Sequence, residues 1–131
     1  PAEEPEPSGP PSTREAVKQR IEELFQLCKE GEYDEAAGYI VYRGEDDLEK
    51  WKTVYDYSTE EGQKATHGLC NRVNAYLSAA DSYSFEEFET EEEGEGLWLV
   101  WEVIFLKGVE RQVVYFAFLE VEGVFALGDI D

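Results

Sequence analysis

The sequence predicts an α+β fold, in which three N-terminal helices pack on a curved four-stranded antiparallel sheet. In the N-terminal half, apolar residues recur at the three- and four-residue spacing of amphipathic helices. From Tyr83 onward, β-branched and aromatic residues dominate, as they do in strands. The 131 residues, of which 42% are hydrophobic, suit one domain with its own core, because two halves would each bury too little apolar surface.

The first helix is predicted to begin at Ser12 and to end at Gly31. Ser12 and Glu15 have the spacing of a capping box, and Gly31 supplies the conformational freedom of a helix stop. The apolar stripe between these ends consists of Val17, Ile21, Leu24, Phe25 and Cys28. This regular stripe predicts a helix that buries one face.

Two further helices are predicted before the strands. After a short turn over residues 34–39, Asp46 or Asp47 caps a second helix, and Thr59 caps a third helix that ends near Ala80. The predicted stripe of the second helix is Leu48, Trp51, Val54 and Tyr55. The predicted stripe of the third helix is Leu69, Val73, Tyr76 and Leu77. Each stripe predicts that the helix packs against the sheet.

Four strands are predicted in the C-terminal half. They are Tyr83–Glu92, Leu97–Leu106, Gln112–Val121 and Val124–Ile130. Gly108 and Gly123 stand where tight hairpins need a positive φ, so the last three strands form an antiparallel meander.

Side-chain alternation predicts two apolar faces for this sheet. The inner face carries Leu97, Leu99, Trp101, Val103, Phe105, Val114, Phe116, Phe118, Phe125 and Leu127. The outer face carries Trp98, Val100, Glu102, Ile104, Leu106, Tyr115, Ala117, Leu119, Val121, Ala126 and Ile130. An antiparallel sheet normally leaves its second face to water, and three helices cover only one face. We therefore expect the outer face to be a homodimer surface.

The net charge of −20 disfavours binding to nucleic acid and to membrane surfaces. With 31 Asp and Glu against 11 Lys and Arg, the surface field repels nucleic acid and anionic lipid headgroups. No apolar run reaches the ~20 residues of a membrane-spanning helix. The chain begins at Pro1 and contains no Met, so we expect an initiator and an export signal upstream.

Residues 1–12 are predicted to form a disordered Pro/Glu-rich tether, and residues 13–131 a single domain. The segment contains all five prolines, with Glu, Ser and Gly between them, which favours extended and solvated backbone. It resembles the stalk that follows the lipidated Cys of bacterial lipoproteins, which predicts a periplasmic or cell-surface location with a lipid anchor upstream of Pro1. A frayed terminus is an equally weighted alternative.

Two segments resemble the nuclear transport factor 2-like superfamily, whose members have a cystatin-like α+β cone. "KEGEYDEAAGYI" resembles the link from the first helix into a short second helix, and "VVYFAFLEVEGVFALGDID" resembles the closing hairpin. The resemblance implies a pocket between helices and concave sheet, and dimerisation through the sheet. It implies no reaction, because the superfamily includes ketosteroid isomerase-like and polyketide cyclase-like enzymes as well as noncatalytic domains. Exported lipoprotein-like members look nearest.

Catalysis in such a cone requires a carboxyl group or a histidine inside the apolar pocket, near a hydrogen-bond donor. The predicted inner face is apolar except at its ends, Gln112 and Asp129, whereas Glu102 and Tyr115 share the outer face. A register shift of one residue would turn Glu102 and Tyr115 inward. The catalytic candidates are therefore Glu102, Tyr115 and Asp129, while the single histidine, His67, fits a half-exposed structural role better than a catalytic one.

No metal or cofactor is expected. One His and two separated Cys do not supply the four ligands of a zinc site, and the glutamate-rich segment 86–95 lacks the alternating pattern of a calcium loop. Cys28 and Cys70 lie on or beside two helical stripes that should pack together. They are either a disulfide, which would contribute about 4 kcal/mol, or two buried thiols.

Three functions remain open from the sequence. The favoured one is an exported noncatalytic domain that binds a small apolar or aromatic molecule, or a protein partner, in the cone pocket. The residues expected to line this pocket are Trp51, Tyr55, Tyr39, His67 and Trp101. The alternatives are a small-molecule isomerase or lyase that uses a pocket carboxylate, and a dimeric scaffold without a ligand.

Overall fold

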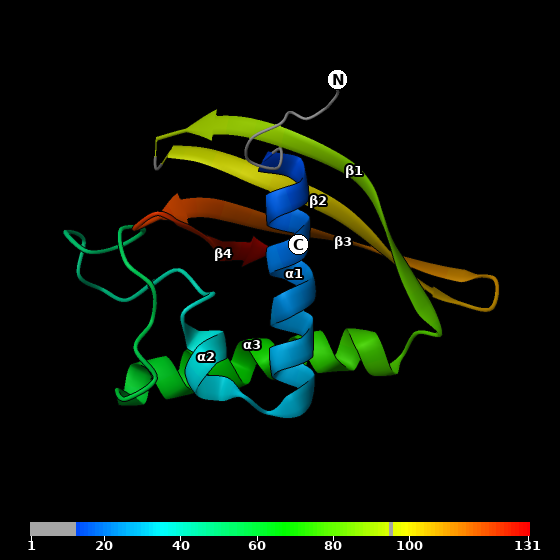
Figure 1. Ribbon diagram of the computed structural model, residues 1–131, viewed down its shortest axis with the longest axis horizontal. Helices are drawn as coiled ribbons and strands as arrows, with labels where there is room; N and C mark the ends of the chain where they lie inside the picture. Colours follow the sequence, from blue (N-terminus) through cyan, green and yellow to red (C-terminus); the bar gives the residue numbers. More distant parts are fainter. Residues whose placement is uncertain (1–12, 95) are drawn as a thin grey trace, which may run out of the picture.

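The computed structural model describes residues 13–94 and 96–131, and it confirms the predicted α+β fold (Figure 1). The elements are α1 (Thr13–Glu30), α2 (Tyr33–Ala37), α3 (Glu60–Ser78), β1 (Ser82–Glu93), β2 (Gly96–Lys107), β3 (Glu110–Val121) and β4 (Val124–Ile130). The strands form one antiparallel sheet in the order β1-β2-β3-β4. The predicted tether and the predicted cap at Ser12 lie outside the described residues.

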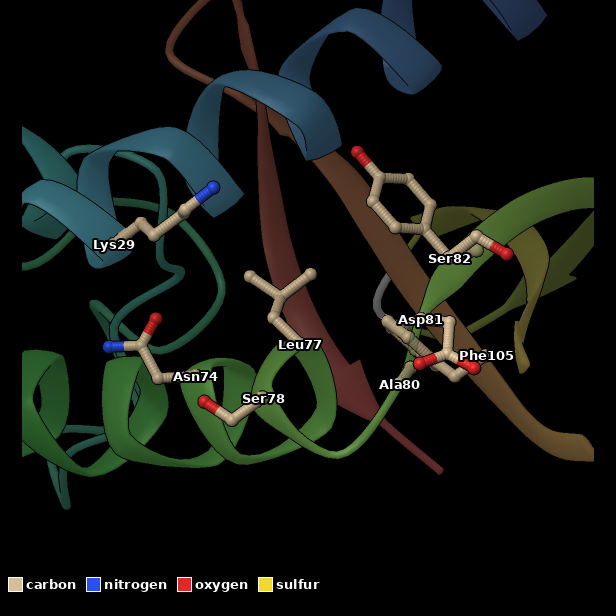
Figure 2. Close-up of a pocket in the computed structure, with 9 residues that line it drawn as sticks. Lys29, Asn74, Leu77, Ser78, Ala80, Asp81, Ser82 and Phe105 are labelled. Atoms are coloured by element: carbon tan, nitrogen blue, oxygen red, sulfur yellow. The ribbon is translucent and has the colours of Figure 1, made fainter. Parts of the chain in front are cut away.

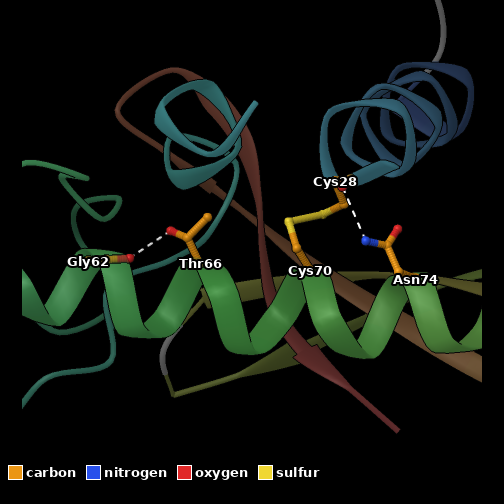
Figure 3. Close-up of a disulfide and its surroundings, with 5 residues drawn as sticks. All are labelled: Cys28, Gly62, Thr66, Cys70 and Asn74. Atoms are coloured by element: carbon orange, nitrogen blue, oxygen red, sulfur yellow. Dashed lines mark hydrogen bonds between the residues drawn. A yellow bond between two sulfur atoms is a disulfide. The ribbon is translucent and has the colours of Figure 1, made fainter. Parts of the chain in front are cut away.

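The two long helices form where the apolar stripes predict them. All five residues of the first predicted stripe are buried in α1. The hydroxyl of Thr59 accepts a hydrogen bond from the amide of Gly62 at 2.9 Å, which caps α3 as predicted. Figure 3 shows the disulfide between Cys28 and Cys70 that joins the two helices. The sequence had left this pairing open.

The predicted second helix over residues 46–55 does not form. Residues 46–52 make turns with local hydrogen bonds, such as that from the amide of Lys50 to the carbonyl of Asp46 at 2.9 Å. The segment then pairs with residues 40–42: the amide of Trp51 donates to the carbonyl of Tyr42 at 3.3 Å, and that of Tyr55 to the carbonyl of Ile40 at 3.0 Å. Trp51 has a φ of 67°, which no helix accommodates. Long-range pairing thus overrides the local apolar spacing, and the short helix between the long ones is α2.

The strand register places the predicted inner face against the helices. In the β2–β3 ladder, Trp101 is opposite Phe116, and Glu102 is opposite Tyr115 on the other face. The side chains of Trp101, Phe116 and Phe118 are at most 1% exposed, and all belong to the core cluster with α1 and α3. The prediction of the inner face is confirmed from Leu99 to Phe105 in β2 and from Val114 to Phe118 in β3, whereas Leu97, at the start of β2, is 49% exposed.

A register shift corrects the predicted alternation at the end of β4. Phe118 pairs with Leu127, but Ala117 pairs with Asp129, so Gly128 is an extra residue in β4. Beyond this bulge the faces exchange. Ile130, predicted on the outer face, lies in the core cluster, and Asp129, predicted on the inner face, shares the outer face with Ala117.

Part of the outer face is covered by the chain itself, which corrects the expectation that the whole face needs a neighbour. A second cluster of buried residues combines Val41 with Leu119, Val121 and Ala126 of β3 and β4. Trp51 packs over it, edge-on to Trp98 at a ring distance of 5.5 Å. The opposite end of this face stays exposed, with Val113 and Tyr115 each 42% exposed.

Candidate functional site

A groove of about 720 Å³ opens where the C-terminal ends of α1 and α3 meet the start of β1 (Figure 2). We call it the α1/α3 groove. It is lined by Lys29, Asn74, Leu77, Ser78, Ala80, Asp81, Ser82, Tyr83 and Phe105. This lining combines apolar side chains with hydroxyl, amide and charged groups, as small-molecule sites do.

The last turns of α3 bring three lining residues to one face. Asn74, Leu77 and Ser78 are spaced three and four positions apart, which places them on the same side of a helix. Figure 2 shows Lys29, from α1, and Asn74 and Leu77, from α3, extending into the space between the two helices. The Asn74 side-chain amide donates to the carbonyl of Cys28 at 3.2 Å, so the amide is held beside the disulfide (Figure 3).

The floor of the α1/α3 groove is tied to the sheet. The Asp81 amide donates to the carbonyl of Leu106 at 2.7 Å, and the Asp81 carboxylate accepts from the amide of Gly108 at 3.2 Å. Both bonds link the short connection after α3 to the β2–β3 hairpin. The connection that lines the groove is therefore hydrogen-bonded to the sheet through both its backbone and its side chain.

Aromatic rings form the inner wall of the α1/α3 groove. Phe105 stacks on Tyr76 at a ring distance of 5.3 Å, and Tyr83 packs edge-on against Phe25, also at 5.3 Å. Burial, and then the negative charge of Glu22, raises the pKa of Tyr83 above its ordinary value. The phenol of Tyr83 is therefore neutral at physiological pH and can donate a hydrogen bond.

The residues predicted to line a ligand pocket lie in separate surroundings. Trp101 is 1% exposed in the core, and its indole nitrogen donates to the carbonyl of Arg14 at 3.0 Å. The hydroxyl of Tyr39 donates to the carboxylate of Glu23, a residue of α1, at 3.0 Å. Burial, followed by this hydrogen bond, raises the pKa of Tyr39.

The other three predicted ligand residues are also apart from the α1/α3 groove. His67 stacks on Tyr33 at a ring distance of 4.3 Å, and its Nε2 is 2.6 Å from the hydroxyl of Tyr57. Trp51 covers part of the outer sheet face, and Tyr55 lines a smaller pocket beside β4. None of the five predicted residues is among the nine that line the α1/α3 groove.

The catalytic candidates Glu102 and Tyr115 do meet, but on the outer face of the sheet. The Tyr115 hydroxyl donates to the Glu102 carboxylate at 3.2 Å, and this bond is the main reason that the pKa of Tyr115 is raised. The register shift that would turn them inward is absent from the β2–β3 ladder. Asp129 lies elsewhere, with its carboxylate 3.8 Å from the guanidinium of Arg43.

The sequence reasoning missed the polar lining of the α1/α3 groove. The sequence does contain one indication of this lining: Asn74 and Ser78 lie four residues apart beside the apolar stripe of α3, and so share one side of the helix. It does not reveal a site by itself, because polar residues beside a stripe normally face water.

Within the residues that the structure describes, no group of three His, Cys, Asp or Glu is placed to hold a metal. No helix in that part of the chain is long and apolar enough to cross a membrane.

Comparisons with known proteins identify the fold. No family model matches the chain, and no curated protein matches it. The chain is similar to a solved structure of a designed nuclear transport factor 2-like protein whose title begins Rd1NTF2_05, with a TM-score of 0.50 and 14% sequence identity. The match covers 92% of this chain and 98% of that chain. The chain therefore has a nuclear transport factor 2-like fold.

Proposed function

We propose that this chain is a noncatalytic binding domain that holds a small aromatic molecule in the α1/α3 groove. The observation that carries the proposal is the groove itself, whose 720 Å³ falls within the range of about 300–1,000 Å³ for small-molecule sites. Leu77 and Tyr83, which are both partly exposed, offer apolar surface to an aromatic ring. The hydroxyl of Ser78 and the ammonium of Lys29 offer donors to a polar or anionic substituent.

The charged lining of the groove is one cation and one carboxylate, and Lys29 is the group that can pair with an anionic substituent on the ligand. Lys29 and Asp81 are the charged residues of the groove, and Asp81 already accepts a hydrogen bond from the backbone. In a chain of net charge −20, an ammonium group at the edge of a groove is a local exception. An aromatic acid would place its ring on Leu77 and Tyr83 and its acid group near Lys29.

We also propose that the protein works outside the cytoplasm, as a periplasmic or cell-surface domain of the lipoprotein-like type. The disulfide supports this location, because Cys28 and Cys70 are each at most 1% exposed and disulfides persist in oxidising compartments. The isomerase or lyase alternative has less support. Its candidates, Glu102, Tyr115 and Asp129, lie outside the α1/α3 groove.

The groove can be tested with 1-anilinonaphthalene-8-sulfonate, an aromatic anion whose fluorescence rises on transfer to apolar surroundings. We expect saturable binding to the folded chain. Ser78→Trp fills the space between the helices and should weaken binding at least about tenfold. Lys29→Gln should weaken it about threefold, because the ammonium is exposed and screened.

Lys64→Gln is the matched control for this experiment. Lys64 is an exposed lysine of α3 that does not line the groove, so its removal should leave the dissociation constant unchanged. Unchanged binding in Ser78→Trp would overturn the groove proposal. Binding that is lost instead on Val113→Glu would place the dye on the outer sheet face.

The exposed part of the outer face is proposed to form a homodimer. Val113 and Tyr115 are each 42% exposed on this face, and their partners across the β2–β3 ladder are Ile104, which is 5% exposed, and Glu102. The two exposed side chains are the contacts proposed for the dimer. We expect a solution mass of twice 15.0 kDa by light scattering, and a mass of 15.0 kDa for Val113→Glu. Val109→Glu is the control, because Val109 lies in the β2–β3 turn and is 98% exposed. A wild-type mass of 15.0 kDa would contradict the proposed dimer.

A further inference from the structure

A second pocket of about 240 Å³ lies between the N-terminal half of α3, residues 40–43 and the end of β4. We call it the β4 pocket. It is lined by Ile40, Arg43, Tyr55, Ala65, Gly68, Leu69, Arg72, Leu127, Gly128, Asp129 and Ile130. It shares no lining residue with the α1/α3 groove, which is formed by the opposite end of α3.

Two arginines are held in place on this pocket by the backbone of β4. One terminal nitrogen of Arg43 donates to the carbonyl of Gly128 at 3.0 Å, and one of Arg72 donates to the carbonyl of Ile130 at 3.3 Å. The Nε of Arg72 also donates to the hydroxyl of Tyr76 at 3.0 Å. A guanidinium has five N–H donors, so these bonds orient each arginine and leave further donors for a ligand.

The charge of the β4 pocket is opposite to that of the molecule. The charged residues of its lining are Arg43, Arg72 and Asp129, which together carry one net positive charge. The Asp129 carboxylate is 3.8 Å from Arg43, and both side chains are about half exposed. Since acidic residues outnumber basic ones by 31 to 11 in the chain, two arginines on one small pocket are suited to an anion.

Gly68 lies at the exposed edge of this pocket, on α3. A glycine inside a helix lowers helix stability relative to alanine. At Gly62 the missing side chain avoids a clash, because a Cβ there would lie 2.0 Å from the carbonyl oxygen of Asp56. At Gly68 no heavy atom of the described chain lies within 4 Å of an added Cβ. Packing within the described fold therefore does not explain this glycine.

We propose that the β4 pocket binds a small organic monocarboxylate, with its carboxylate between Arg43 and Arg72. Planar guanidinium groups match the geometry of a carboxylate, which can accept two parallel hydrogen bonds. The apolar part of the ligand packs on the partly exposed Leu69 and beside Gly68. The volume, below the usual range for drug-sized ligands, restricts the ligand to about the size of benzoate.

Benzoate is the probe for the first test, in a titration of the full chain followed by ¹⁵N NMR at constant ionic strength. We expect saturable shifts of the Ala65 and Gly68 amides. Arg43→Gln and Arg72→Gln should each weaken binding about fivefold, because both guanidinium groups are partly exposed. Arg111→Gln is the matched control, since Arg111 is an exposed arginine of β3 outside this pocket and should leave binding unchanged.

A pair of substitutions at Gly68 separates loss of binding from loss of folding. Gly68→Ala should raise the melting temperature and retain benzoate binding, because the added methyl group meets open space and favours the helix. Gly68→Leu should stay folded and lose saturable binding, because its side chain occupies the pocket. Both variants should bind 1-anilinonaphthalene-8-sulfonate like the wild type, so failure at this pocket is distinguishable from failure at the α1/α3 groove.

Three results would overturn this assignment. The first is an absence of saturable benzoate shifts at Ala65 and Gly68 in the wild type. The second is undiminished benzoate affinity in both arginine variants or in a folded Gly68→Leu. The third is inorganic phosphate binding as tightly as benzoate, which would show that the pocket selects charge and gains nothing from the apolar part of a carboxylate.

Discussion

Replacing both Cys28 and Cys70 by alanine is expected to lower the free energy of unfolding by about 4 kcal/mol. The disulfide closes a loop with a sequence separation of 42 residues and so restricts the unfolded chain. For a domain of this size, the loss corresponds to a fall of about 15 °C in the melting temperature. Urea denaturation followed by circular dichroism measures the difference in unfolding free energy directly.

Reduction supplies the control for this prediction. The wild-type protein in dithiothreitol should unfold at a lower urea concentration than the oxidised protein, and the double alanine variant at a slightly lower one still, which dithiothreitol should not change. Both cysteines are buried in the core cluster, so some loss arises from packing alone. Equal stability of oxidised and reduced wild-type protein would refute the stabilising role of the bond and remove the main support for an extracytoplasmic location.

Trp101→Ala is expected to cost about 4 kcal/mol of stability, which would show that Trp101 is a core residue and not a ligand contact. Its side chain is 1% exposed, and the ring packs edge-on against Phe85 and at a tilt against Phe88, each at 5.3 Å. The guanidinium of Arg14 lies 5.1 Å from the ring centre. Thermal and urea denaturation of the purified variant measure the loss.

Trp101→Phe separates packing from hydrogen bonding at this position. Phenylalanine retains most of the buried ring but lacks the indole N–H that donates to the carbonyl of Arg14. We expect a smaller loss of about 1–2 kcal/mol. A loss below about 1 kcal/mol for Trp101→Ala would contradict the packed core and restore a pocket at this position.

Much of the fold could be predicted because its signals are local. The hydroxyl of Thr59 caps α3 by accepting a hydrogen bond from the amide of Gly62, only three residues further along the chain. Gly108 and Gly123 adopt a positive φ in the hairpin turns. Alternation along β2 and β3 predicted the buried face because strand geometry repeats every two residues. These features depend on neighbours in the chain, which the sequence displays directly.

The candidate sites could not be predicted in this way, because each is assembled from distant segments. The α1/α3 groove joins Lys29, Asn74 and Phe105, and the β4 pocket joins Arg43, Arg72 and Asp129. Of the residues predicted as functional, Tyr55 and Asp129 line the β4 pocket. Glu102 and Tyr115 were predicted as a pair and do form one, on the outer face.

The sequence by itself determined the two long helices, the four strands, the tight turns and which face of β2 and β3 is buried. Tertiary structure decided the conformation of residues 46–55, the bulge at Gly128 and the partial cover of the outer face. In each of these places the backbone or side chains pair with residues far away in the chain. The free energy of those contacts outweighs the local preference that a periodic pattern records.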